Sequence, residues 1–550
     1  MLHLRAFAAL VLSLLPLVAQ QPNCAGCHPE IAARLPESAH ASLGCLGCHP
    51  KYVTVPHPPG LGLPQCADCH PTAEATYITG AHGIAVRAGN TAAPDCAACH
   101  GTAHELPFAR SEKFRLSVPK MCGGCHPDVA KNYLESIHGT AFESGNFDAP
   151  FCSTCHGNHV QVPLANVGAL GQPGLIRDTC ASCHANLLLA RRYQLPLTVV
   201  QSFNNTYHGL ALKAGNLAVA NCGSCHRVHL VLPSSDPRSS VNQANLPATC
   251  GKCHPGAGAR FAIGTIHIVP GTAPVALKMV TVAYTFLIPL MLTYMAAHHL
   301  GDFIHKLKRL RLRTTPVGPF PAHLPELNAE TRMHRFERIE HVVLLVSFTV
   351  LAWSGFALLY PNAWWAWPLV TWEPVYPVRG MVHRAAAAVL LTGGVMHAGS
   401  LLLDMNLRRH WWTLWPRRKD IPEFFLNTAY NLGLRKQKPL ISSHSYIEKL
   451  EYWAVIWGTV VMAITGGMLW FNWYTLQVLP KTWLDVSVAI HLFEATLATL
   501  AIIIWHFYMV IFDPEVYPMD PAWIHGVSVR RRVRESPEEE DQTPPPGAEP

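Results

Sequence analysis

The sequence predicts a mainly α-helical protein made of two unlike halves: a loop-rich first half with short helices and a five-helix membrane bundle. The first half repeats the pattern Cys-x-x-Cys-His nine times, which uses all 18 cysteines. Near residue 270 the composition changes from Cys, His, Gly and Pro to Leu, Val, Ala and Trp. Five apolar segments follow, each close to the roughly 20 residues that span hydrocarbon. We therefore expect one domain over 21–270 and a second over 271–520.

The repeated pattern is the attachment signature of c-type haem, in which two thiols bond the haem vinyl groups and the adjacent imidazole ligates iron. One copy could arise by chance or as a thioredoxin-like redox pair, but nine copies with no cysteine left over predict nine covalent haem c groups. The attachment cysteines are Cys24, Cys27, Cys45, Cys48, Cys66, Cys69, Cys96, Cys99, Cys122, Cys125, Cys152, Cys155, Cys180, Cys183, Cys222, Cys225, Cys250 and Cys253. The motif histidines are His28, His49, His70, His100, His126, His156, His184, His226 and His254.

An internal repeat supplies candidates for the second axial ligand of each iron. Stretches from His82, His138 and His208 share a free His-Gly, a Gly-Asn pair, the next motif and another free histidine. Residues 21–270 hold nine histidines outside the motifs, which matches the nine haems. Bis-histidine iron has no open position, so we expect these haems to carry electrons rather than to transform a substrate. The expected distal ligands are His40, His57, His82, His104, His138, His159, His208, His229 and His267.

The N-terminus and the basic residues predict the topology. Residues 1–20 have Arg5 followed by an apolar stretch, which predicts a secretory signal peptide, with an uncleaved anchor as the alternative. Residues 21–270 would then lie outside the cytoplasm. Lys and Arg cluster after the first, third and fifth apolar segments, so those ends face inside. The expected spans are about 274–298, 340–360, 382–404, 448–471 and 486–512. The net charge of +7 gives no reason to expect a nucleic-acid partner.

Histidines inside the apolar segments predict two further haems, of b type. His383 and His397 are 14 residues apart and His491 and His506 are 15 apart, so each pair shares one helix face. Each pair rises about 21–22 Å along its helix, enough to place one haem toward each side of the bilayer. Depth pairs His383 with His491 at the outer haem, and His506 with either His341 or His397 at the inner haem. The alternative is a bundle whose histidines make only polar contacts between helices.

The second half resembles a known family over about 335–515. The segments RFERIEHVVLLVSFTVLAWSG, HRAAAAVLL, EKLEYWAVIWGTVVMAITGGMLW and HLFEATLATLAIIIWHFY are similar to helices of the cytochrome b subunits of formate dehydrogenase, nickel–iron hydrogenase and thiosulfate reductase. The resemblance implies that His341 pairs with His506 and leaves His397 near a quinone. The additional first helix and the fused nine-haem half depart from that family. This fusion resembles the inner-membrane quinol-oxidising cytochromes of metal-reducing bacteria.

From these features we expect a multi-pass protein of the bacterial inner membrane with its haem c domain in the periplasm. The expected activity is that of a menaquinol:cytochrome c oxidoreductase in anaerobic or extracellular respiration. Electrons would pass from the membrane quinone pool through two haem b and nine haem c to periplasmic c-type cytochromes. Quinol oxidation needs a proton acceptor beside the ring. The candidates at the inner ends of helices are Glu337, Glu340, Asn427, Tyr430, Glu448 and Glu451.

Two alternatives remain open from the sequence. The first half could be a multihaem reductase that keeps one open haem, or the protein could be an electron relay or quinone reductase that works with a partner dehydrogenase. Three histidines near the end of the first span, His298, His299 and His305, are expected at the interface rather than as ligands. The acidic, proline-rich end of the chain within 521–550 is expected to be a disordered cytoplasmic tail.

Overall fold

In this computed structural model the described residues are 23–161, 175–260, 263–264, 266–268, 273–312, 332–439 and 444–528. These residues are mainly helical and contain no β-strand, so the predicted fold class is confirmed. The predicted signal peptide at 1–20 lies outside the described residues, as does the predicted disordered tail over 521–550 beyond residue 528. Residues 521–528 of that tail are described, and they include the short helix α27 (Ala522–His525).

Contacts along the chain divide it into two compact units. The first comprises Met1–Ser182 and Cys222–Asn242, and the second comprises Cys183–Asn221 and Gln243–Pro550. The second unit therefore contains the membrane helices together with part of the cysteine-rich half. The predicted boundary at residue 270 is defined by a change in composition, whereas the compact units are defined by contacts. The boundary therefore stays a prediction.

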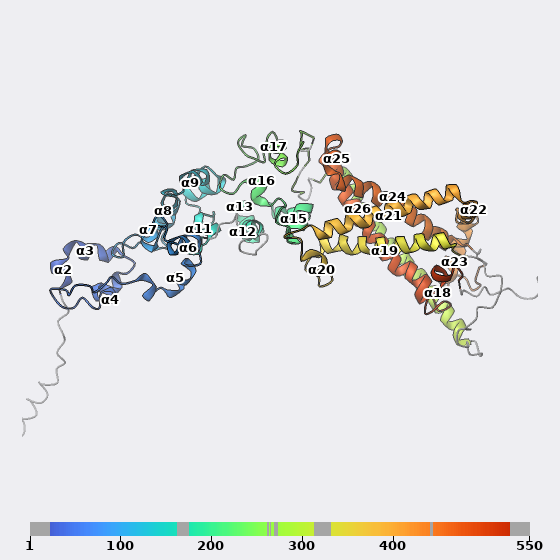
Figure 1. The fold of residues 1–550 in the computed structure, drawn as a ribbon, viewed down its shortest axis with the longest axis horizontal. Helices are drawn as coiled ribbons and strands as arrows, with labels where there is room; N and C mark the ends of the chain where they lie inside the picture. The colour runs from blue at the N-terminus through green and yellow to red at the C-terminus, as the bar shows by residue number, and fades with distance from the viewer. Residues whose placement is uncertain are drawn as a thin grey trace, which may run out of the picture. The chain divides into compact units, whose positions relative to one another are not determined.

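Short helices separated by loops form the first unit (Figure 1). The motif helices α2 (Cys24–Cys27), α4 (Gly44–Cys48), α7 (Cys96–His100) and α11 (Cys152–His156) are only four or five residues long. Two sequence features end them. After α7 and α11 comes a glycine in a left-handed conformation, Gly101 with φ 81° and Gly157 with φ 83°. Elsewhere a proline follows the motif histidine and begins a new helix, as Pro29 does for α3 (Pro29–Arg34).

The first unit buries little apolar material of its own. Its buried apolar side chains among the described residues are Ala130, Tyr133, Phe142 and Leu232. Many large apolar side chains are instead exposed, such as Leu63 at 77% and Val55 at 71%. A unit of this length needs far more buried apolar surface to offset the conformational entropy of folding. The amino-acid side chains alone therefore do not account for its stability.

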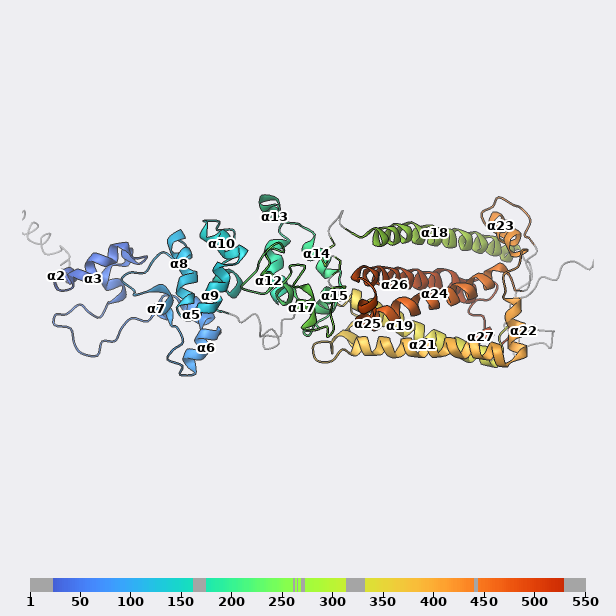
Figure 2. The same cartoon turned by 90° about the horizontal axis from the view of Figure 1, so that it is seen from above.

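Five long helices dominate the second unit, and both ribbon views show them side by side (Figures 1 and 2). They are α18 (Val275–Leu312), α19 (Arg335–Leu359), α21 (Val378–Leu403), α24 (Tyr446–Trp470) and α26 (Lys481–Ala501). Within the described residues these five are long and apolar enough to cross a membrane, which confirms the predicted multi-pass arrangement. The helix α19 packs on α21, and α26 packs on both α24 and α18.

The last span ends in an irregular helix. The helix α26 continues into two π-helical turns, η5 (Ile502–His506) and η6 (Tyr508–Phe512). A π-helical turn takes up one more residue than an α-helical turn, so it rotates the side chains that follow around the helix axis. His506 lies at the end of η5, which means that its direction is set by this irregularity.

Shorter helices cover the two ends of the bundle. At the end that carries the basic residues lie α22 (Met405–Thr413), α23 (Asp420–Asn431) and α27 (Ala522–His525). At the other end lie α20 (Trp367–Val370) and α25 (Asn472–Val478). The helix α18 crosses α23 where Gly301 faces the main chain of Asn431.

We expect Gly301→Ala to weaken the packing of α18 on α23. A Cβ atom at this position overlaps the Asn431 carbonyl, and backbone cannot move as easily as a side chain. Overpacking of this kind costs about 1–3 kcal/mol, so the thermal midpoint of the detergent-solubilised protein should fall by several degrees. The control is Gly394→Ala in α21, where a Cβ meets nothing within 4 Å. Equal midpoints for the two variants would contradict the expected close contact.

Candidate functional site

In the first unit, motif histidines meet the predicted distal histidines as pairs of facing rings. Each of these pairs joins one motif histidine to one histidine from outside the motifs. The angle between the two ring planes runs from 10° to 36°. The pairs and their centroid distances are His28–His57 (6.3 Å), His40–His70 (5.9 Å), His49–His104 (6.1 Å), His82–His126 (6.3 Å), His100–His159 (6.2 Å) and His156–His229 (6.1 Å).

This separation is too large for direct stacking and suits a metal ion between the rings. Ring atoms in van der Waals contact lie about 3.5–4 Å apart. A metal with an imidazole nitrogen about 2 Å away on each side separates the ring centres by about 6 Å. The histidine geometry therefore fits haem iron with two axial imidazoles, and the motif cysteines adjoin one ring of every pair.

The second unit contains one more pair of this kind. His208 and His254 have ring centroids 6.1 Å apart, and burial lowers the pKa of both imidazoles. A lowered pKa favours the neutral imidazole, which is the form that binds iron. His267 is also half-buried, and its Nδ1 lies 3.1 Å from Ser202 Oγ. For His267, as for His138, His184 and His226, the ligand role stays a prediction.

Two pairs of rings lie within the membrane helices. His383 of α21 and His491 of α26 have ring centroids 6.4 Å apart, and His341 of α19 lies 6.3 Å from His506 of η5. Between the two alternatives that the spacing left open, the structure brings His341 rather than His397 to His506. Each pair joins two helices and leaves the same gap that is seen between the rings of the first unit.

Hydroxyl groups orient the rings of the outer pair, which is His383 and His491. Ser354 Oγ lies 2.8 Å from His383 Nδ1, and Thr465 Oγ1 lies 2.9 Å from His491 Nδ1. Both hydroxyls also donate to a carbonyl of their own helix, so each ring nitrogen is the donor in its contact. The Nε2 atom of each ring then keeps its lone pair for a metal.

Glycines leave room beside the same rings. A Cβ at Gly466 would lie 3.2 Å from His491 Cε1, and a Cβ at Gly355 would lie 3.6 Å from His383 Cε1. The absence of a side chain at these positions allows the ring and a flat cofactor to approach the helix closely. The outer pair therefore fits a haem held without covalent bonds.

His397 takes part in a different set of contacts. Its Nδ1 lies 3.0 Å from Glu340 Oε2, and its Nε2 lies 2.7 Å from the Tyr452 hydroxyl. Both ring nitrogens are thus engaged by protein groups, and this arrangement offers neither to iron. Glu451, the residue before Tyr452, has its Oε1 atom 3.6 Å from His506 Nδ1. Two of the predicted carboxylates, Glu340 and Glu451, therefore lie near the inner pair, which is His341 and His506.

The other predicted quinol-site residues do not join this group. Glu337 accepts from the His334 main chain (2.7 Å) and lies 2.8 Å from His410 Nδ1. Glu448 caps α24 through Ser445. Asn427 donates to Tyr446 (2.8 Å), and the ring of Tyr430 stacks on His305. Asn427 and Tyr430 on α23 lie against His298 and His305 of α18, away from the inner pair, and the quinol-site role of the six residues stays a prediction.

Two histidines of α18 need a correction. His298 and His299 were expected at the interface, but they are only 2% and 5% exposed. His298 Nε2 lies 3.1 Å from both the Tyr446 hydroxyl and Asn431 Nδ2. The ring of His299 packs on Trp505, next to His506. The sequence contains a signal for this burial: Asp302 and Lys306, one and two turns further on, carry charges that a lipid-facing helix would avoid.

One comparison with known proteins matches this part of the chain. Residues 332–518 match the family model described as Prokaryotic cytochrome b561. This range contains α19, α21, α24 and α26 with both membrane histidine pairs, and it excludes α18 and the cysteine-rich half. The match supports a membrane-bound b-type cytochrome with an electron-transfer function and haem b in this region. No curated protein and no solved structure matches the chain.

We expect Ser354→Ala to reduce haem b retention at the outer pair. The substitution removes the partner of His383 Nδ1, and loss of such an orienting partner typically costs 10–100-fold in metal-site affinity or activity. The measurement is the ratio of b to c haem in purified protein by pyridine haemochrome spectra. Ser347→Ala is the control, since that buried hydroxyl bonds only to carbonyls of its own helix. An unchanged ratio in Ser354→Ala would count against haem at this pair.

Proposed function

We propose that this protein is a membrane quinol dehydrogenase, a menaquinol:cytochrome c oxidoreductase of the bacterial inner membrane. Quinol from the membrane pool gives up electrons near the inner histidine pair, and the electrons leave through periplasmic c-type cytochromes during anaerobic or extracellular respiration. The observation that carries the proposal is the repeated ring spacing of about 6 Å, in the membrane helices and in the Cys-x-x-Cys-His half alike.

The proposal includes eleven haems. Two haem b fit between His341 and His506 and between His383 and His491, and nine haem c fit at the nine motifs. Bound haem supplies one-electron chemistry, whereas the protein holds each iron and its orientation. Bis-histidine coordination leaves no position for a substrate, which favours electron transfer over a reductase with an open haem. The ring pairs support this for seven of the nine motifs.

The residues around His397 support quinol oxidation at the inner side. Oxidation of one quinol releases two electrons and two protons, and the protons need acceptors near the ring oxygens. The Tyr452 hydroxyl, His397 and Glu340 form one hydrogen-bonded row that joins α24, α21 and α19. In the proposed site the Tyr452 hydroxyl gives its proton to His397 Nε2 as it takes one from the quinol, and the carboxylate of Glu340 stabilises the imidazolium that forms. Glu451 beside His506 serves as a second acceptor.

The second unit also suggests where electrons leave the membrane. Arg260, six residues beyond His254, donates to the Val478 carbonyl at 2.9 Å. Lys481 at the start of α26 is near enough to His208 to contribute to the lowering of its pKa. His491 follows Lys481 by ten residues, or about 15 Å along the helix. We propose that the haem between His208 and His254 receives electrons from the outer haem b.

We expect His397→Ala to slow quinol oxidation while leaving both haem b in place. Loss of a positioned proton acceptor typically costs 10²–10⁴-fold in rate. The measurement is anaerobic stopped-flow with a menaquinol analogue, in which the b and c α-bands are followed separately. In the wild type the b bands should be reduced first and the c bands second.

The control for His397→Ala is His305→Ala, because that histidine contacts Tyr430 on α23 instead of the inner pair. Equal rates in the two variants would remove His397 from the proposed site. If a reduced c-type cytochrome reduces both bands and quinol reduces neither, the protein runs in the opposite direction or works as a relay with a partner.

We expect His208→Ala to separate the two phases of the same experiment. Reduction of the b bands should keep its wild-type rate, and reduction of the c bands should slow at least tenfold because the first c haem loses a ligand. His57→Ala alters a haem that is not at the proposed exit, so the early part of its c phase should be normal. Identical c phases in the two variants would show that electrons leave the membrane at another haem.

A further inference from the structure

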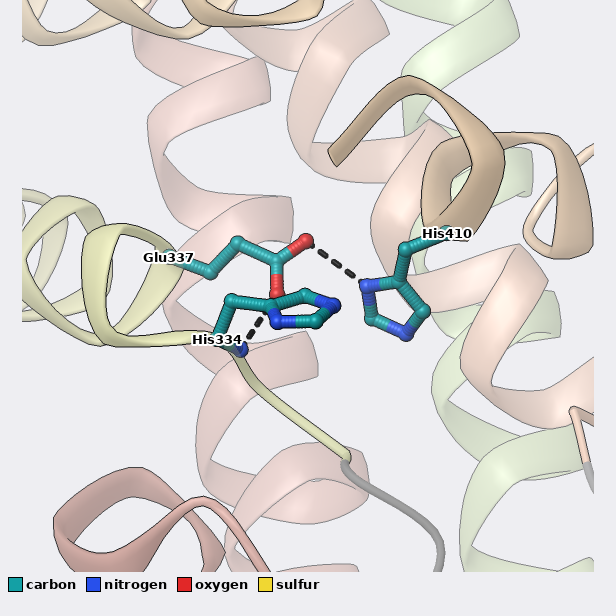
Figure 3. A group of neighbouring side chains, drawn as sticks. All are labelled: His334, Glu337 and His410. Carbon is teal, nitrogen blue, oxygen red and sulfur yellow. Dashed lines mark hydrogen bonds and ion pairs between the residues drawn. The ribbon is translucent and has the colours of Figure 1, made fainter. Parts of the chain in front are cut away.

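A second group of convergent ligands lies outside the histidine pairs. His334 at the start of α19, Glu337 in its first turn and His410 on α22 each offer one ligand atom, and these atoms lie within 4.8 Å of one another (Figure 3). The rings of His334 and His410 are 5.2 Å apart and nearly perpendicular, at 81°. Two rings in this orientation pack edge to face, and the Glu337 carboxylate lies beside both of them.

The chemistry of the group is that of a zinc site. Two imidazoles and one carboxylate are a known ligand set for zinc, which usually binds a fourth ligand or water. Nitrogen donors also disfavour magnesium and calcium, which prefer oxygen ligands. A third imidazole is nearby, since the His444 ring lies 5.5 Å from that of His410.

The surroundings provide what a metal site needs besides its ligands. Glu337 Oε2 accepts from the His334 main-chain N–H at 2.7 Å, which fixes the carboxylate while Oε1 faces His410. His410 is 11% exposed, and its Nε2 atom is buried with no hydrogen-bond partner. A cavity of about 590 Å³ is lined by His334 and His410, among others, and gives an ion a path to the group.

We propose that His334, Glu337 and His410 bind one divalent transition-metal ion of the zinc class. The ion ties the start of α19 to α22. Glu337 is four residues before His341, so the site lies one helical turn from a ligand of the proposed inner haem and on the same helix face. The ion is distinct from every haem iron, and the proposal does not depend on the direction of electron flow.

The test uses the full-length purified protein in detergent, treated with a chelator and then dialysed against zinc chloride. Elemental analysis counts zinc against haem iron in the same sample. We expect the wild type to bind one more zinc per chain than Glu337→Gln or His410→Ala, with at least a tenfold loss of affinity in each variant. His305→Ala is the control and should retain that zinc.

Glu337→Gln also guards against simple unfolding, because glutamine can still accept the helix-capping hydrogen bond. A ligand that binds only the folded protein raises its thermal midpoint. Zinc should therefore raise the midpoint of the wild type and of His305→Ala, and leave that of the other two variants unchanged. If the wild type binds no more zinc than His410→Ala, the group is a helix cap with a neighbouring histidine and the proposal is wrong.

Discussion

The structure depends on holding two imidazole rings about 6 Å apart, with a gap between them that fits one metal-bound plane. A motif supplies only one ring, because Cys-x-x-Cys-His contains a single histidine. The second ring has to arrive from elsewhere in the chain: His104 faces His49, and His229 faces His156. Each pair therefore ties two distant segments together. Since the first unit buries few apolar side chains, we infer that bound haem supplies the apolar material that its core lacks.

The membrane helices meet the same constraint with different means. Long helices hold their rings rigidly, so no covalent bond to the cofactor is needed. The Nδ1 atom of each ring, which points away from the metal, still needs a hydrogen-bond partner. In the outer pair, Ser354 and Thr465 provide this partner: each hydroxyl accepts from Nδ1 and donates to a carbonyl of its own helix. For the inner pair Glu451 takes this place beside His506. A carboxylate there is also a proton acceptor, and this difference is consistent with the proposal that quinol is oxidised beside the inner pair.

Sequence periodicity could predict the helices and the depth of the histidines, but it could not choose between His341 and His397. Both lie near the inner ends of their helices, and the choice depends on contacts between helices. Glu340 and Tyr452 occupy both nitrogens of His397, and neither contact can be seen in a hydropathy pattern. The π-helical turns before His506 could not be predicted either. The six predicted quinol-site residues share a depth but not a direction, and Asn427 and Tyr430 face His298 and His305 of α18.

The first membrane helix is the part that the sequence described least well, and its polar residues explain its role in the bundle. Lipid chains are as apolar as leucine, so apolar surface alone does not hold one membrane helix against another. The inner end of α18 is held by Lys306, which lies 2.6 Å from Asp302 and 2.8 Å from the fully buried Asp513 beyond η6. Buried charges are tolerated only when they are paired, and removal of one partner is strongly destabilising. Because Tyr508 also donates to Asp302, this network fixes α18 to the segment that carries His506. The helix that joins the cysteine-rich half to the bundle therefore helps to fix the inner histidine pair and is not only an anchor.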